Sequence, residues 1–135
     1  MSENDRLIWR VPLVPPNLLN RRMHFRAKRR LQETWKEFLL VSGIATGMTP
    51  LQVANLARYR ARMGWRTKTR VDIAIHHIKH FDPDGLRAAC KIPLDALKEM
   101  GFIADDSEDF ITLEVTQVKV HRKTQQQTII ALEAE

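Results

Sequence analysis

The pattern of hydrophobic and polar positions predicts five strands along the chain. Residues 69–79 show the pattern most clearly, because apolar side chains alternate at Val71, Ile73 and Ile75, as on a half-buried strand. Comparable apolar runs predict four further strands, at about residues 6–11, 52–62, 110–120 and 128–134. The residues MGWRTKT, between the second and third strands, are expected to form a hairpin loop.

Two segments show helical spacing instead. Leu31, Trp35 and Phe38 share one face of a helix predicted over about residues 23–44. A second helix is predicted from about Asp84 to Met100, because Gly101 favours a helix end. Pro93 lies inside that helix, lacks a backbone N–H and is expected to bend it.

The predicted order is therefore β-α-β-β-α-β-β. This order is typical of an α/β or α+β fold, with a mixed, mainly antiparallel sheet covered by two helices. A chain of 135 residues is long enough to bury a hydrophobic core, and we expect residues 1–135 to form a single domain.

Composition excludes several classes of protein. With 44% hydrophobic and 28% charged residues, the chain resembles a globular protein rather than a disordered one. No apolar run is long enough for a membrane span, and the N-terminus does not resemble a signal peptide, so we expect no membrane association. Cys90 is the single cysteine, which excludes an internal disulfide and a cysteine-based zinc site and fits a reducing cytoplasm.

Charge is distributed unevenly along a chain whose formal net charge is +6. Residues 82–114 contain nine acidic and three basic residues, a net charge of −6, which leaves +12 for the rest. Residues 21–30 and 58–70 each carry six Lys or Arg and no acid. Such runs can be solvated faces that favour solubility, but two of them favour a nucleic-acid partner. The predicted DNA-binding residues are Arg21, Arg22, Arg26, Lys28, Arg29, Arg30, Arg58, Arg60, Arg62, Arg66, Lys68 and Arg70.

Four aspartates in the acidic part suggest chemistry on phosphate. Asp82 and Asp84 lie between a predicted strand end and a helix start, and Asp105 and Asp106 precede the next strand. If those strands are neighbours, the four carboxylates could meet at one edge of the sheet. Carboxylates gathered in this way need a cation to stay ionised together, and oxygen ligands suit Mg²⁺.

The helix after Asp84 adds two candidates. Lys91 and Asp95 are seven and eleven residues further on, so helical geometry returns both to the face of Asp84. A lysine there could stabilise charge that develops on a phosphate. The alternative is structural, with Asp82 and Asp84 forming a turn and helix cap and Asp105–Asp106 a surface turn.

Three motifs in this region resemble a known family. The string D-P-D-G-L, then K-x-P-x-x-D-A-L, then G-x-x-x-D-D, is similar to the signature of the RusA family of Holliday-junction resolvases, which are phage- and prophage-borne. The N-terminal segment VPPNLLNRRMHFRAKRR also resembles the opening of that family, with its basic helix. Together the matches extend from about residue 12 to residue 118.

The resemblance implies roles for particular residues. Asp82, Asp84 and Asp106 would be the metal-binding catalytic carboxylates, Lys91 the catalytic lysine, and Asp95 and Asp105 supporting acids. It implies a Mg²⁺-dependent endodeoxyribonuclease, with Mn²⁺ as a possible substitute, that nicks four-way DNA junctions symmetrically in recombination and repair. It also implies a homodimer in the cytoplasm of a bacterium or phage-infected cell, since paired nicks need two sites related by twofold symmetry.

The sequence departs from the family in two places. Gly85 stands where the family has Asn, and the spacing from Asp84 to Lys91 is three residues longer than in short members. Two alternatives stay open, and Gly85 is the feature that keeps the second of them open. One is a nuclease that acts on other branched or duplex DNA, and the other is a catalytically silent DNA-binding protein of the same fold.

Other residues of types that bind metals or DNA are weaker candidates for a functional site. His76 and His77 are adjacent on a predicted strand and point to opposite faces, so they do not easily share an ion. His80 beside Asp82 remains a possible ligand, and Trp65 could either stack on an unpaired base or pack at a loop tip. Cys90 lacks an activating partner and is expected to be a small buried residue.

Overall fold

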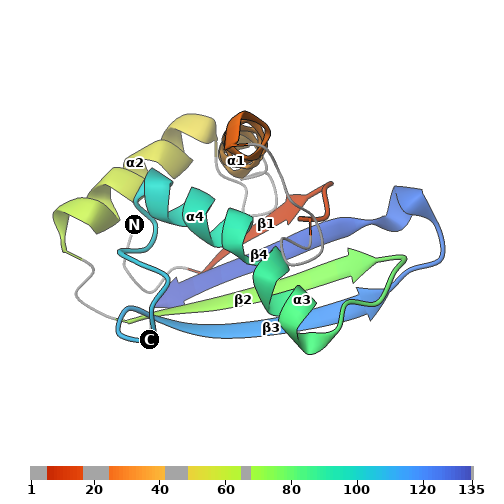
Figure 1. Cartoon of the computed structure of the whole chain (residues 1–135). Coiled ribbons are helices and arrows are strands. Elements are labelled where there is room, and N and C mark those ends of the chain that lie inside the picture. The colour runs from red at the N-terminus through yellow and green to blue at the C-terminus, as the bar shows by residue number, and fades with distance from the viewer. Residues whose placement is uncertain (1–5, 17–24, 42–48, 65–67, 135) are drawn as a thin grey trace.

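The computed structural model describes residues 6–16, 25–41, 49–64 and 68–134 (Figure 1). Strands are β1 (Leu7–Val11), β2 (Thr69–His77), β3 (Ile111–Lys119) and β4 (Gln127–Ala134). Helices are α1 (Phe25–Val41), α2 (Pro50–Arg62), α3 (Pro83–Ala89), α4 (Lys91–Met100) and the short 3-10 helix η2 (Lys123–Gln125).

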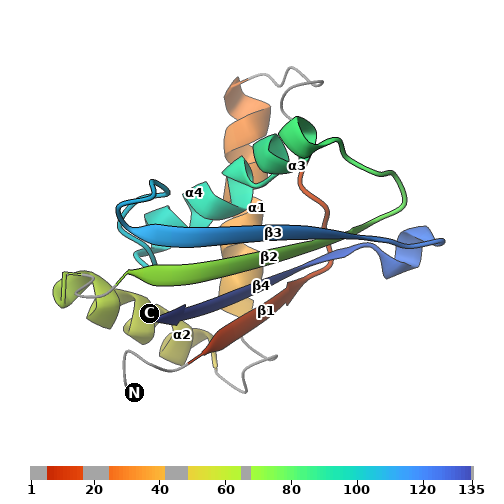
Figure 2. The ribbon, with the colours of Figure 1, turned by 90° about the horizontal axis from the view of Figure 1, so that it is seen from below.

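The four strands form one mixed sheet in the order β1-β4-β2-β3 (Figure 2). Strand β4 is antiparallel to both of its neighbours, with Leu7 opposite Leu132 and Ile73 opposite Ile130. Strands β2 and β3 are parallel and start together, with Thr69 beside Ile111. The prediction of a mixed, mainly antiparallel sheet is therefore confirmed.

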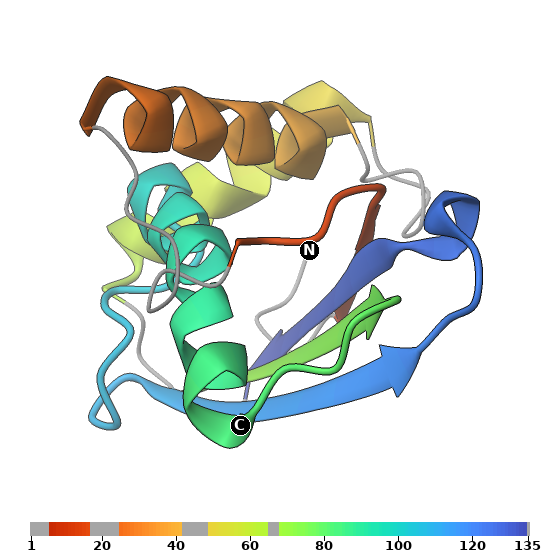
Figure 3. The same cartoon turned by 45° about the vertical axis from the view of Figure 1, so that its right-hand side comes forward.

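All four α-helices lie on the same side of this sheet, which gives two layers (Figures 1 and 3). Helix α1 packs across α4 and also contacts α2 and β1. Alternation along β2 places Val71, Ile73 and Ile75 in the core between the layers. The indole of Trp9 is buried there, donates a 2.8 Å hydrogen bond to the Leu39 carbonyl and packs edge-on against Phe102.

The strand predicted over 52–62 is wrong, because these residues belong to helix α2. Thr49 begins the helix with a capping box, in which its hydroxyl accepts from the Gln52 N–H and the Gln52 side chain accepts from the Thr49 N–H. Pro50 follows at a position where its fixed φ suits a helix start. The loop expected to make a hairpin therefore joins α2 to β2, and the described residues form four α-helices instead of the two that were predicted.

The predicted helix from Asp84 to Met100 is divided into α3 and α4 at Cys90. Pro93 lies in the first turn of α4, where its missing N–H would otherwise bond to the Ala89 carbonyl. The structure therefore has a break between two helices at Cys90, three residues before the proline, in place of the expected bend. Gly101 ends α4 in a left-handed conformation with φ of 91°, as its position predicted.

Membrane-spanning character is absent from the described part of the chain. None of the helices there combines the length and the apolar content that crossing a bilayer requires.

Candidate functional site

The acidic loop, here residues 78–84, follows β2 and includes the start of helix α3. Asp82 is its N-cap, and its carboxylate accepts a 2.6 Å hydrogen bond from the Gly85 N–H. Pro83 occupies the first helical position and Asp84 follows in the first turn, with an exposed side chain. The helix-cap alternative thus holds for Asp82, while Asp84 remains available to a ligand.

A residue that the sequence analysis missed fixes this loop to the sheet. Gln117 of β3 donates from its amide to the Phe81 carbonyl at 2.9 Å and accepts from the Phe81 N–H at 3.0 Å. The same amide lies 3.2 Å from the His80 ring nitrogen. Gln117 follows Ile111, Leu113 and Val115 at alternating positions of the strand. A single polar residue on an otherwise apolar strand face was therefore the feature of the sequence that could have indicated its role.

Lys91, the first residue of α4, lies between two carboxylates. Its ammonium is 3.1 Å from Asp95, one helical turn further on, and 3.4 Å from Asp106. The hydrogen bond that Lys91 donates to Asp95 raises the pKa of Lys91, against partial burial, and the Asp106 carboxylate adds to the effect. The lysine is therefore charged at neutral pH and already in contact with two of the predicted acids.

Asp105 has a partner of its own. Lys98, near the end of α4, lies 3.1 Å from its carboxylate, and that hydrogen bond lowers the pKa of Asp105. The adjacent acids thus pair with lysines two turns apart on α4, Asp105 with Lys98 and Asp106 with Lys91. These ion pairs hold the 105–106 turn against the helix.

A groove of about 1160 Å³, here called the acidic groove, runs between α3, α4 and strand β3. Asp84 from the acidic loop, Lys91 from α4 and Asp106 from the turn before β3 all line it. Apolar side chains of both layers form its floor, among them Leu86, Leu94, Leu113 and Val115. The structure therefore brings three of the predicted catalytic residues onto one surface.

The groove does not gather the carboxylates as the sequence analysis expected. Strand β3 does pair with β2, but in parallel, so Asp105 and Asp106 approach near Thr69, while Asp82 and Asp84 follow the far end of β2. Among the described residues, no group of three or more His, Cys, Asp or Glu is placed to hold a metal ion. Asp84, Asp106 and Glu108 all line the groove, but they are not gathered into such a group.

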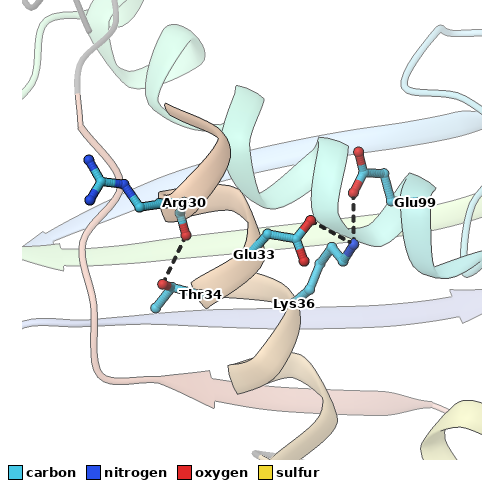
Figure 4. Close-up of polar contacts among 5 residues, drawn as sticks. All are labelled: Arg30, Glu33, Thr34, Lys36 and Glu99. Atoms are coloured by element: carbon cyan, nitrogen blue, oxygen red, sulfur yellow. Dashed lines mark hydrogen bonds and ion pairs between the residues drawn. The ribbon is translucent and has the colours of Figure 1, made fainter. Parts of the chain in front are cut away.

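The first basic run lies partly on α1. Arg26, Arg29 and Arg30 are exposed there and Lys28 is half-buried, whereas Arg21 and Arg22 lie outside the described residues. Helix α1 is tied to α4 by Lys36, whose ammonium lies 3.2 Å from Glu33 and 3.0 Å from Glu99 (Figure 4). The Glu99 hydrogen bond raises the pKa of Lys36, and Lys36 in turn lowers the pKa of Glu99.

The second basic run divides into surface and structural residues. Arg58, Arg62 and Lys68 are exposed, and Arg66, like Trp65, lies outside the described residues. Arg70 pairs with Asp72 at 3.3 Å and with Glu114 at 2.8 Å on the sheet, which raises its pKa and offsets its charge locally.

Arg60 is misassigned as a DNA-binding residue. Its side chain is only 8% exposed, because it points into the molecule between α2 and the sheet. The guanidinium donates to the Phe102 carbonyl at 3.0 Å and to the Thr69 hydroxyl at 2.7 Å. Arg60 therefore joins α2 to the turn after α4 and to the start of β2.

Three further residues of types that bind metals or DNA are packed against other parts of the protein. His77 stacks on Phe81 with ring centroids 5.0 Å apart, and burial lowers its pKa. Cys90 is buried, as expected, and burial raises the pKa of its thiol to about 12. Trp35 is fully buried.

A scan of the chain against models of protein families finds no family that matches. A search of curated proteins finds no match either.

Proposed function

We propose that the protein is a Mg²⁺-dependent, structure-selective endodeoxyribonuclease that nicks four-way DNA junctions. The observation that carries the proposal is the groove that Asp84, Lys91 and Asp106 line, since these residues come from three separate segments. The motifs similar to those of the RusA family point to the same residues. The net charge of +6 favours a polyanionic substrate.

The donor set fits a magnesium ion of the kind that enzymes use with phosphate substrates. Mg²⁺ is commonly held by one or two carboxylates together with substrate phosphates and waters, so a third gathered acid is not required. Asp84 and Asp106 would hold it, with Asp82 at the edge of the site, and Mn²⁺ accepts the same oxygen ligands. When bound, such an ion lowers the pKa of an attacking water and offsets charge on the phosphate.

The protein side chains have their own part in this proposal. Lys91 would donate to the phosphate oxygens as negative charge develops on them, and its raised pKa keeps it protonated for that role. Asp95 orients the Lys91 ammonium from one turn along α4. Asp105 holds the turn that carries Asp106 through its contact with Lys98.

Binding of the DNA arms would use the exposed cations of α1 and of the α2 end. Arg26, Arg29 and Arg30 belong to the first set and Arg58, Arg62 and Lys68 to the second. Affinity that rests on such contacts falls steeply as salt increases. A homodimer would supply two grooves related by twofold symmetry, which matches the two nicks needed to resolve a junction.

Cleavage of matched substrates tests this proposal. A four-way junction and a linear duplex of the same sequence are incubated with the protein in Mg²⁺ and in EDTA. We expect paired nicks in the junction only, and only with metal. Equal cleavage of both substrates would instead identify a nuclease of broader specificity.

The contact between Lys91 and Asp106 favours a second candidate, a catalytically silent DNA-binding protein. The lysine already pairs with Asp106, and the described residues contain no group of three or more carboxylates placed to hold a metal ion. Tight junction binding, with no cleavage in Mg²⁺ or Mn²⁺, would establish this candidate.

A further inference from the structure

A second cavity, of about 1050 Å³, lies on the other side of the acidic loop. It is open to solvent and is lined by residues 12–16, helix α1, the chain that follows β2, and η2. Phe81 lines this cavity, whereas Pro83 and Asp84 line the acidic groove. The loop that carries the proposed catalytic acids therefore separates the two hollows.

The two hollows differ in charge. Arg30, Lys79 and Lys123 line the second cavity, and no acid is among its described lining residues. These cations come from α1, from the chain after β2 and from η2, so only the fold brings them together. None of the three pairs with a carboxylate of the described residues, whereas Lys91 in the acidic groove pairs with two.

The walls of the cavity strengthen the effect of those charges. Residues 12–16 contribute three prolines, which have no N–H to offer a ligand, and Leu31, Ile78 and Phe81 add apolar surface. Positive side chains around a concave surface of low polarity focus the electrostatic potential and attract anions. The cavity thus offers cationic donors on an apolar background.

We infer that this cavity, here called the basic cavity, binds phosphodiester groups of the DNA strand on one side of the acidic loop. The inference deepens the proposed function, on which it rests for the identity of the ligand. It assigns Lys79 and Lys123, which lie outside both basic runs, to strand binding. A strand held there would be adjacent to the loop that carries Asp82 and Asp84.

Binding measurements in EDTA test the inference without cleavage. A fluorescent four-way junction is titrated with wild type, with Lys79→Gln/Lys123→Gln, and with Arg6→Gln/Arg10→Gln. The last variant removes two exposed cations at and before β1, away from the cavity, and so matches the change in charge. We expect the first variant to bind about tenfold more weakly, with a salt dependence smaller by about two phosphate contacts. The control should change less than twofold.

Each other outcome overturns the inference. Equal losses in the two variants would mean that only total charge matters, and unchanged binding by the lysine variant would mean that DNA does not enter the cavity. NMR of the His77 ring provides a second readout, because His77 lines the cavity. Ring signals that move with a deoxynucleoside monophosphate but not with DNA would identify a free-nucleotide site instead. The expected tenfold loss of affinity in the lysine variant, together with no cleavage by wild type in Mg²⁺, is the exception: it would reject the nuclease proposal and still support DNA binding in the basic cavity.

Discussion

The Lys91 ammonium lies 3.4 Å from the Asp106 carboxylate, although 15 residues separate them in the sequence. A fixed positive charge at this point opposes a cation on the same carboxylate and attracts a phosphate. Lys91 would therefore have opposite effects on metal binding and on cleavage.

Substitution of Lys91 separates these effects. In Lys91→Met we expect tighter Mn²⁺ binding, because the competing charge is gone, and slower junction cleavage by at least about tenfold. Calorimetric Mn²⁺ titration and a cleavage time course measure the two quantities. Lys98→Met is the matched control, since Lys98 is equally exposed and pairs with Asp105. Weaker metal binding in Lys91→Met would contradict the assignment.

The burial of Arg60 predicts a loss of stability rather than of DNA affinity. Arg60→Met leaves the Phe102 carbonyl and the Thr69 hydroxyl without their charged donor, so we expect a loss of about 2–4 kcal/mol in the free energy of unfolding. Urea denaturation measures it. Arg62→Met, two residues along on the exposed side of α2, should stay within about 0.5 kcal/mol of wild type. A similar effect of both changes would argue against the contacts of Arg60.

Two glycines with positive φ differ in their surroundings. A Cβ at Gly101 would lie 3.3 Å from the Ala57 carbonyl oxygen, whereas a Cβ at Gly64 would meet nothing within 4 Å. Gly64→Ala should cost about 1 kcal/mol for its φ of 71° alone. We expect Gly101→Ala to cost about 2–3 kcal/mol, because the crowding against α2 adds to the strain. Equal melting temperatures of the two variants would contradict this packing.

His77 predicts a pH dependence of stability. Burial lowers its pKa below the usual 6.5, although a hydrogen bond with the Lys79 backbone opposes this, and the charge of Lys79 contributes a smaller lowering. The unfolded chain therefore binds a proton more readily. Stability should therefore be full above pH 6.5 and fall as the pH drops through the lowered pKa. Glu99 and Asp105, whose pKa values are lowered, contribute only at more acidic pH.

Replacement of His77 by Asn tests this origin. The free energy of unfolding is measured by urea denaturation at several pH values between 7 and 5. His77→Asn should flatten the profile over this range relative to wild type. An unchanged slope in the variant would place the titrating group elsewhere.

Much of the sheet was predictable from sequence, and the reason is local. Alternation along 69–79 and 110–120 is specific to strands, because one face of each packs on the helices. The segment 52–62 was misread because its short apolar runs also suit a helix. The decisive signal was the capping box formed by Thr49 and Gln52, together with Pro50 at the first helical position.

The sequence singled out three residues that line the groove, but it could not show how they are arranged. Nothing in the sequence distinguishes parallel from antiparallel pairing of β2 and β3, yet that choice decides from which side Asp106 approaches. Local sequence likewise cannot show that Arg60 points inward, because its partners Phe102 and Thr69 come from other elements. The convergence of Lys79 and Lys123 on one cavity also depends on tertiary structure.

Cleavage of a four-way junction by Asp84→Asn tests the central claim most directly. Asp109→Asn is the control, because Asp109 is an exposed acid that does not line the groove. In Mg²⁺ we expect paired nicks from wild type and from the control, and a rate lower by roughly 100-fold or more in Asp84→Asn, the scale on which loss of one catalytic charge slows an enzyme. All three proteins should bind the junction alike in EDTA. Binding without cleavage by wild type, or equal cleavage by Asp84→Asn, would contradict the account.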